Sequence, residues 1–209
     1  MSESDKRQHW EAIYSGRSPL EVSWYQKEPS LSLRLIDSCN LEKDAAIIDV
    51  GGGASLLVDR LLDRGYTRLA VLDISPTALS FARNRLGAKA QSIEWFEADI
   101  TAFQPPHPFS LWHDRAVFHF LTEASDRGRY TEVLQTSLKP GGHLILAAFA
   151  IGGPTACSGL DIVQYNADKL RAELGDDFKL VDEDAETHTT PAGAKQSFSY
   201  FHLQKSSNA

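Results

Sequence analysis

Residues 45–55 read Ala-Ala-Ile-Ile-Asp-Val-Gly-Gly-Gly-Ala-Ser, which is typical of a buried strand, a glycine turn and the start of a helix. A second strand is predicted at 69–73, Leu-Ala-Val-Leu-Asp, and it ends in an acid about 20 residues after the last glycine. In nucleotide-binding α/β folds, glycines let the backbone approach the ligand, and such an acid accepts hydrogen bonds from ribose hydroxyls. The pattern therefore predicts a nucleoside site.

The acid before the glycines separates two classes of nucleoside ligand. The pattern is Asp49-x-Gly51-x-Gly53-x-Ser55, whereas a dinucleotide site would have G-x-G-x-x-G and a helix N-terminus aimed at a pyrophosphate. A carboxylate at position 49 would repel a pyrophosphate and attract an ammonium group. S-adenosylmethionine (SAM) has an ammonium, a sulfonium and a ribose, and no phosphate. We expect Gly51 and Gly53 to provide backbone conformations and space that a side chain would remove.

Residues 49–55 resemble motif I of the class I SAM-dependent methyltransferases, (D/E)-x-G-x-G-x-G, with Ser55 in place of the third glycine. Later segments are similar to the family's other motifs, in the same order: Asp73, 98–100, 109–114 and 138–142. The resemblance covers roughly residues 45 to 150. It implies an α/β fold with a doubly wound, mostly parallel seven-stranded sheet and an antiparallel C-terminal hairpin. It also implies SAM as the cofactor and S-adenosylhomocysteine as the product.

The resemblance implies specific roles at the cofactor site. We expect Asp49 to lie near the amino group of SAM, Asp73 to bind the ribose hydroxyls and Asp99 to hold the adenine amino group. Ile74 and Ile100 would flank the adenine and supply apolar area. The alternatives are structural, because Asp49 and Asp73 could instead cap helices and Asp99 could be a surface turn acid.

The chain is predicted to form one domain over 1–209, divided into an N-terminal lid or helical segment (1–40), a cofactor-binding core (45–150) and an acceptor-side loop, helix and hairpin (151–209). The aromatics Trp10, Tyr14, Trp24 and Tyr25 either form a lid, in which Trp24 faces the sulfonium, or pack as an ordinary N-terminal helix. Residues 1–9 are expected to be frayed and 206–209 disordered. The expected elements are strands 47–50, 69–73, 93–97, 109–113 and 143–150, helices 30–39, 55–64, 76–86, 123–137 and 166–174, and an antiparallel pair, 178–183 with 196–204.

Candidate catalytic residues follow the fourth strand, because ligands of this fold lie beyond the carboxyl ends of the strands. They are Arg115, His119 and His113. Arg115 could hold an anionic substrate or lower the pKa of a thiol, or form an ion pair with Asp114 or another acid. His119 resembles the histidine common after this strand in small-molecule members, where it is either a general base or a hydrogen-bonded structural residue.

Composition limits the classes of partner. The net charge of −7 argues against nucleic acid, and the (D/N/S)-P-P-(Y/F) motif of nucleic-acid amine methyltransferases is absent from the sequence. No run of eighteen apolar residues occurs and the first residues are polar, so we expect a cytoplasmic protein with no membrane partner. Cys39 and Cys157 have no metal-ligand spacing, so no metal is expected. The sequence does not predict an oligomeric state.

The expected activity is methyl transfer from SAM to a small-molecule acceptor. Because no convincing base dyad is present, a soft or already ionised acceptor such as a thiol or sulfide is favoured. The alternative is a protein lysine methyltransferase, since 9–14 followed by Trp24 and Tyr25 is similar to the W-(D/E)-x-x-Y openings of some of those enzymes. Two other classes remain open, a non-catalytic SAM-binding module and a nicotinamide-dependent oxidoreductase.

Overall fold

The computed structural model describes residues 2–207, and its centre is a seven-stranded sheet in the order β3-β2-β1-β4-β5-β9-β8. Strands β1 to β5 pair in parallel, whereas β9 is antiparallel to both β5 and β8. The predicted doubly wound sheet with a C-terminal antiparallel hairpin is confirmed. The strands are β1 (Ala46–Val50), β2 (Arg68–Asp73), β3 (Ile93–Glu97), β4 (Phe109–Arg115), β5 (Leu138–Phe149), β8 (Phe178–Thr189) and β9 (Lys195–Lys205), with a separate pair, β6 (Ala156–Cys157) and β7 (Leu160–Asp161).

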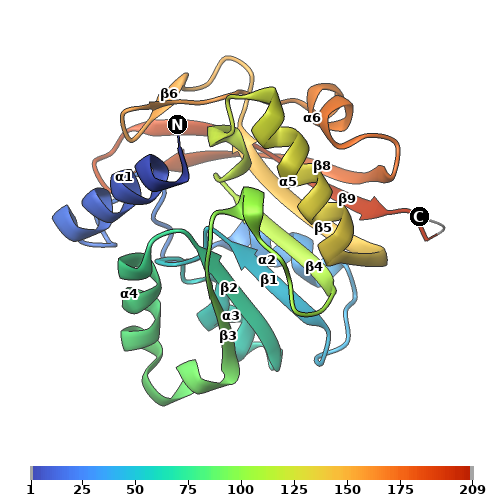
Figure 1. Ribbon diagram of the computed structural model, residues 1–209, viewed down its shortest axis with the longest axis horizontal. Coiled ribbons are helices and arrows are strands. Elements are labelled where there is room, and N and C mark those ends of the chain that lie inside the picture. The colour runs from blue at the N-terminus through green and yellow to red at the C-terminus, as the bar shows by residue number, and fades with distance from the viewer. Residues whose placement is uncertain (1, 208–209) are drawn as a thin grey trace.

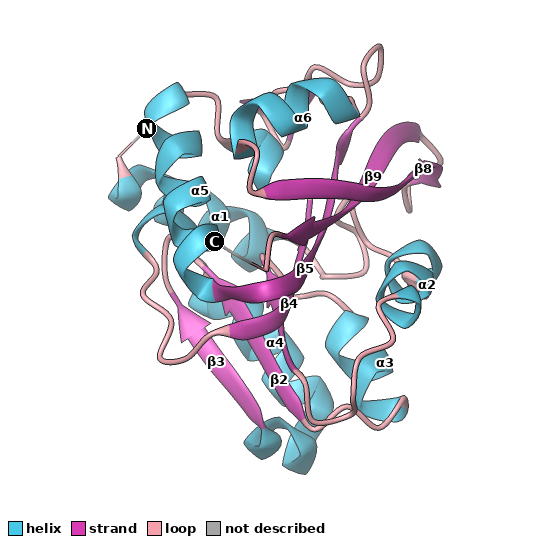
Figure 2. Cartoon of the chain, turned by 90° about the vertical axis from the view of Figure 1, so that its right-hand side faces the viewer, coloured by secondary structure: helices cyan, strands magenta, loops and turns pink. Residues whose placement is uncertain are grey.

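Helices cover both faces of the sheet. They are α1 (Glu3–Gly16), α2 (Ser30–Ser38), α3 (Leu57–Asp63), α4 (Pro76–Leu86), α5 (Ala124–Ser137) and α6 (Ala167–Leu174), with short 3-10 turns at Gly87–Ser92, Ile100–Ala102 and Phe118–Phe120. Figure 2 shows α2 and α3 on one side of the strands and α5 on the other. Two apolar cores result, one under α5 and α6 and one under α2, α3 and α4. In the described part of the chain, no helix is long and apolar enough to cross a membrane.

Local sequence signals explain where the central elements begin and end. Strand β1 is buried along its whole length between β2 and β4, which is why its sequence is almost continuously apolar, with Asp49 as the polar exception. Helix α4 begins at Pro76 after Ser75, whose Oγ accepts a hydrogen bond from the backbone N–H of Ala78 at 3.0 Å. It ends at Gly87, whose φ of 55° few other residues adopt.

The two termini differ from the expectation. Residues 1–9 were predicted to be frayed, but α1 begins at Glu3, stabilised by a capping box. In this box Ser2 Oγ accepts from Asp5 N at 3.2 Å and Ser2 N donates to Asp5 Oδ2 at 3.1 Å. Of the tail expected to be disordered, 208–209 lie outside the described residues, whereas Ser206 N donates to Asp177 O at 2.8 Å.

The C-terminal half also departs in detail. The fifth strand was expected at 143–150, but β5 begins at Leu138, and its pairing with β4 is irregular between the pairs Phe109–Leu138 and Leu111–His143. Strands β8 and β9 are longer than predicted, and only residues 190–194 connect them. The β6–β7 pair was not predicted, because two-residue strands carry no detectable alternation.

Candidate active site

A cavity lies beyond the carboxyl ends of the central strands and opens to solvent. This is the edge of a doubly wound sheet at which ligands bind. Many of the residues predicted from the sequence line it: Trp24, Gly51, Asp73, Ile74, Asp99, Ile100 and Arg115. Asp49, Gly53, His113 and His119 lie outside that lining.

The glycine turn after β1 is held tightly against its neighbours. The backbone N–H groups of Gly51 and Gly52 both donate to the carbonyl of Leu72, at 2.7 and 3.2 Å. Gly51 has a φ of 68°, and a Cβ there would overlap the side chain of Val117. A Cβ on Gly53 would lie 2.6 Å from that of Ala78. Packing around the turn therefore requires glycine at both predicted positions.

Asp49 and His113 form a buried pair behind this turn. Asp49 Oδ1 lies 2.7 Å from His113 Nδ1, and His113 Nε2 lies 2.9 Å from Ser32 Oγ on α2. The other Asp49 oxygen, Oδ2, is buried and has no hydrogen-bond partner among residues 2–207. His113, a candidate catalytic residue, is therefore placed where it orients Asp49. A free carboxylate oxygen beside a glycine turn is able to accept a hydrogen bond from an ammonium group.

Asp73 lies at the end of β2 with both oxygens used by the backbone. Oδ2 accepts from Gly53 N at 3.1 Å and Oδ1 from Ser75 N at 2.9 Å. Burial raises the pKa of Asp73 to about 6, although these backbone hydrogen bonds act in the opposite direction. The cap of α4 is Ser75, so the alternative role of Asp73 as its cap is not the observed one. Ile74 follows on the cavity wall.

Asp99 follows β3 and links the cofactor edge to α1. Its Oδ1 accepts from the backbone N–H and the hydroxyl of Thr101, at 2.9 and 2.8 Å. Lys6 Nζ on α1 lies 3.3 Å from Asp99 Oδ2 and 2.9 Å from Asp126 Oδ2. Ile100 is buried next to this bridge and lines the cavity. The first turns of the N-terminal helix thus lie directly against the predicted adenine end.

Three of the four N-terminal aromatics gather over the cavity. Trp24 packs edge-on against Trp10 and Tyr14, with ring centroids 5.7 and 6.0 Å apart, and all three line the cavity. Tyr25 instead lines smaller neighbouring hollows. Helix α1 lies beside α4 (Figure 1), where Glu11 accepts hydrogen bonds from Ser75 and Thr77. The segment before α2 therefore forms one wall of the cavity.

Arg115, the last residue of β4, is fixed at the other end of the cavity. Its Nε donates to Tyr200 Oη at 2.8 Å and its Nη1 to the carbonyl of Trp24 at 2.9 Å. The guanidinium Cζ lies 4.5 Å from the centroid of the Phe198 ring. Nη2 lies 3.5 Å from Glu186 Oε2 and is buried without a hydrogen-bond partner in the described residues. The guanidinium is held in place and keeps N–H capacity for a further acceptor.

The expected ion pair of Arg115 is with Glu186 on β8, whereas Asp114 has a different role. Asp114 accepts hydrogen bonds from Tyr130 Oη at 2.7 Å and from Val117 N at 2.9 Å. Burial raises its pKa to about 6. Asp114 therefore fixes the turn that follows β4, including the Val117 side chain that packs against the glycine turn.

His119 is fully buried and its ring is not part of the cavity wall. Its Nδ1 lies 3.4 Å from Phe149 N, and its Nε2 has no partner within residues 2–207. Burial, together with the charge of Arg115, lowers the pKa of His119 to about 3, so the imidazole is neutral. Its packing between the rings of Phe120 and Phe149 favours the structural alternative over the general base.

Comparison with known proteins agrees with this geometry. The family described as "Methyltransferase domain" matches residues 47–142, the segment that contains the glycine turn, Asp73 and Arg115. Residues 47–142 thus form a SAM-dependent methyltransferase domain. No curated protein sequence matches this methyltransferase.

Solved structures share the fold of this methyltransferase over nearly its whole length. One, from work on the conversion of a disulfide bond into a thioacetal group during echinomycin biosynthesis, has a TM-score of 0.79 at 18% identity and covers 97% of this chain and 93% of its own. A SAM-dependent methyltransferase from Anabaena variabilis has a TM-score of 0.73 at 15% identity, over 97% and 94%. The N-methyltransferase NodS from Bradyrhizobium japonicum, solved with S-adenosylhomocysteine, has a TM-score of 0.63 at 18% identity, over 86% and 89%.

Other cavity residues of the methyltransferase were not singled out as site residues. Lys6, Phe149 and Phe198 line the cavity, and Glu186 contacts Arg115 from behind. Each comes from an element remote in sequence from the glycine motif. The only signal for the two phenylalanines is the alternation of their strands, which predicts burial but not a place at the cavity.

Proposed function

We propose that this methyltransferase transfers the methyl group of SAM to a small-molecule acceptor with a soft or ionised nucleophile, such as a thiolate or sulfide. The proposal is carried by the end of the cavity that holds Arg115. There the Arg115 guanidinium is paired with Glu186 and packed on Phe198, and its Nη2 has no hydrogen-bond partner within residues 2–207. Among the described residues no histidine lines the cavity. This environment suits an acceptor that enters as an anion and needs no protein base.

The residues of the other end fit SAM. Asp73 and Ile74 follow β2, Asp99 and Ile100 follow β3, and these acids and apolar groups share one wall of the cavity. The free Oδ2 of Asp49 lies behind the glycine turn as an acceptor for the ammonium group. SAM supplies an electrophilic methyl group on its sulfonium and leaves as S-adenosylhomocysteine. We propose that residues 45–150 bind SAM, that residues 1–40 cover the cavity and that residues 151–209 surround the acceptor.

Arg115 is proposed to hold the acceptor and keep it ionised. An adjacent cation lowers the pKa of a thiol, whereas removal from water raises it, so the charge of Arg115 has to outweigh the desolvation of the acceptor. The aromatic walls, including Trp24 and Phe198, exclude water and leave an unsolvated anion as the nucleophile. Holding two reactants in line is worth roughly 7–11 kcal/mol in well-oriented reactions, so positioning by these rigid groups supplies much of the rate.

One structural neighbour supports chemistry at sulfur. The structure from echinomycin biosynthesis concerns a disulfide bond converted into a thioacetal group, and its fold matches nearly the whole of this chain. At 18% identity the likeness shows only the fold. It favours a sulfur acceptor only in combination with the Arg115 end of the cavity.

The lysine alternative requires a proton acceptor. A lysine side chain must lose its ammonium proton before it attacks the methyl group, and among the described residues no histidine lines the cavity to take that proton. The N-terminal motif that suggested this alternative places Trp10 and Tyr14 on the cavity wall, which is equally consistent with a small acceptor.

The test supplies purified protein with methyl-labelled SAM and parallel acceptors: hydrogen sulfide, small thiols, amines, alcohols and the protein fraction of a cell extract. We expect label in small thioethers or methanethiol. Replacing Arg115 with Gln should lower kcat/KM for thiols by about 10- to 100-fold, because a charge-assisted hydrogen bond is lost. Arg115→Lys should retain part of the activity, and Arg83→Gln, at an exposed position of α4, serves as the control. Label only on amines, alcohols or protein would refute the proposal.

A further inference from the structure

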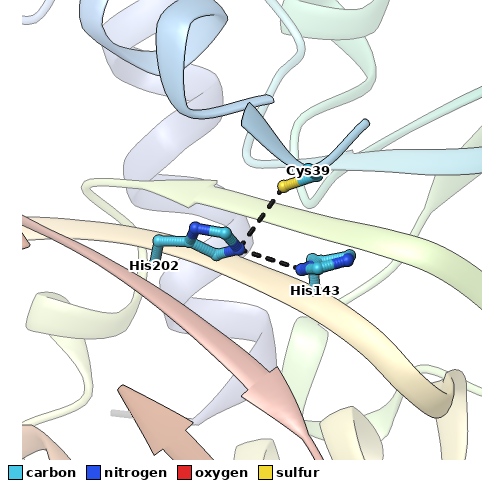
Figure 3. A group of neighbouring side chains, drawn as sticks. All are labelled: Cys39, His143 and His202. Atoms are coloured by element: carbon cyan, nitrogen blue, oxygen red, sulfur yellow. Dashed lines mark hydrogen bonds between the residues drawn. The ribbon is translucent and has the colours of Figure 1, made fainter. Parts of the chain in front are cut away.

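Three side chains of metal-ligand type converge on the α2 side of the sheet, away from the cavity. Cys39 follows the end of α2, His143 lies in β5 and His202 in β9 (Figure 3). Cys39 Sγ is 3.4 Å from His202 Nε2, and His143 Nδ1 is 2.9 Å from the same atom. All three ligand atoms lie within 4.8 Å of one another. His143 precedes Ala147, the partner of Arg115, by four residues, so the cluster lies about 13 Å along β5 from the proposed acceptor site.

One buried nitrogen of this cluster has no hydrogen-bond partner within residues 2–207. His202 Nε2 has two neighbours, and a single ring nitrogen either donates one proton or offers one lone pair. His202 Nδ1 is buried and has no hydrogen-bond partner within the described chain. Either tautomer of His202 therefore leaves a buried nitrogen unpaired, which is costly for a group used only in packing. Three atoms able to act as metal ligands thus lie within 4.8 Å of one another, and in the described part of the chain the Cys39 thiol, 3.2 Å from Leu35 O, is the only one of the three with a backbone acceptor.

We propose that Cys39, His143 and His202 bind a zinc ion, with a water molecule in the fourth position. One thiolate and two imidazoles form a ligand set preferred by zinc and unsuited to calcium or magnesium. Tetrahedral zinc, with bonds of about 2.3 Å to sulfur and 2.0–2.1 Å to nitrogen, places its donor atoms about 3.3–3.6 Å apart. Two of the three donor separations, 3.4 and 2.9 Å, are close to these values, and the third, between Cys39 Sγ and His143 Nδ1, lies within 4.8 Å. Binding would draw the three side chains around the ion.

The two imidazoles are neutral and able to bind a metal at neutral pH, whereas the Cys39 thiol must first lose its proton. Burial lowers the pKa of His143 and of His202, so both rings offer lone pairs at neutral pH. Burial raises the pKa of Cys39 to about 12, with Asp37 adding to the effect. Zinc binding therefore releases the Cys39 proton to solvent as the zinc–sulfur bond forms. Asp182 pairs with His202 across β8 and β9, and its charge acts against the lowering of the His202 pKa.

The ion would join three elements that are far apart in sequence. Cys39 belongs to the segment after α2, and α2 also carries Ser32, which lies 2.9 Å from His113 Nε2 behind the glycine turn. A zinc ion bound by Cys39 and by the histidines of β5 and β9 would fix the end of α2 against the sheet. The sequence-based expectation of no metal rested on local spacing, and these three residues are separated by 104 and 59 positions (143 − 39 and 202 − 143).

The test uses the tag-free, full-length chain, stripped with a chelator and titrated with zinc against a chromophoric competitor. We expect one zinc per chain and a higher melting temperature with zinc. Cobalt in place of zinc should give a thiolate-to-cobalt charge-transfer band. Cys39→Ser should abolish the band, and His202→Gln should weaken zinc binding at least about tenfold.

Matched controls separate this site from adventitious binding. Cys157→Ser and His107→Gln change the same residue types outside the cluster and should bind zinc as the wild type does. Wild-type protein that binds no stoichiometric zinc would overturn the proposal, and this result does not depend on whether any variant folds. Retention of the cobalt band in Cys39→Ser, or its loss in Cys157→Ser, would also overturn it.

Discussion

Burial and ribose binding favour opposite ionisation states of the Asp73 carboxyl group. Its burial between β2 and the glycine turn raises the pKa to about 6, whereas ribose hydroxyls would donate to the ionised carboxylate. The backbone N–H groups of Gly53 and Ser75 already stabilise the ionised form. Below pH 6, cofactor binding at this site therefore has to displace a proton.

We predict that SAM affinity rises with pH between 5 and 7. The free protein holds a proton on Asp73 below its pKa of about 6, so affinity should fall by up to about tenfold for each pH unit below that value. Asp73→Asn should bind SAM at least about tenfold more weakly and with little dependence on pH. Isothermal titration at pH 5, 6 and 7 measures both. Unchanged affinity in Asp73→Asn would mean that the ribose site is elsewhere.

The places of Asp49 and Asp73 in the fold were predictable from the local sequence, and their contacts with SAM stay a prediction. Asp49 and Asp73 each occupy a fixed place after a recognisable strand, and the structure puts Asp73 on the cavity wall. Lys6 and Glu186 were missed because their contacts with Asp99 and Arg115 join segments 93 and 71 residues apart (99 − 6 and 186 − 115). Sequence spacing carries no information about such pairs.

Helix α1 is attached to the core by polar contacts in addition to the apolar packing of Trp10 and Tyr14. Glu11 accepts hydrogen bonds from Thr77 N at 3.1 Å, from Thr77 Oγ1 at 2.7 Å and from Ser75 Oγ, at the first turn of α4. A carboxylate at the N-terminus of a helix is also favoured by the helix dipole. Lys6 provides the second attachment, to Asp99 and Asp126. These contacts hold the helix that carries Trp10 and Tyr14 over the cavity.

We predict that Glu11→Ala loosens α1 without unfolding the sheet. Loss of hydrogen bonds to a charged group should raise amide exchange in α1 by about tenfold or more. Hydrogen–deuterium exchange measures this, with Glu3→Ala, at an exposed position of the same helix, as the control. Equal exchange in the two variants would show that apolar packing alone holds α1.

Elements were predictable where local signals are strong. Helix α4 has the predicted bounds because Ser75 caps its start, Pro76 favours the first helical turn and Gly87 adopts the positive φ that ends it. Strand β8 was predicted too short because most of its residues are exposed and polar, so its length is set by pairing with β9. Residues 1–9 were wrongly predicted to be frayed, because the Ser2–Asp5 capping box was not recognised and the contacts of Lys6 with residues distant in sequence are not visible locally.

The molecule as a whole depends on β9. Phe201 and Leu203 belong to the core under α5 and α6, whereas Phe198 and Tyr200 belong to the core on the opposite face. The same strand brings Phe198 and Tyr200 to Arg115. The hairpin thus completes both cores and the acceptor end of the cavity together.

We predict that Phe201→Ala lowers the free energy of unfolding by about 3–5 kcal/mol, the range for a large aromatic removed from a core. The side chain is fully buried, so a cavity remains. Val181→Ala on the neighbouring β8, where the residue is 55% exposed, should change it by about 0.5 kcal/mol or less. Denaturant unfolding measures both, and similar losses would contradict the role assigned to β9.

The most direct test of the proposed chemistry is the pH dependence of kcat/KM for a series of thiols at saturating SAM. Thiols with pKa values on either side of about 8.5 would be compared above pH 6.5, where Asp73 is largely ionised. If the acceptor enters as a thiolate held by Arg115, the midpoint of each profile should follow the pKa of the thiol. A single midpoint shared by all thiols would reveal a titrating base on the protein and would contradict the proposal.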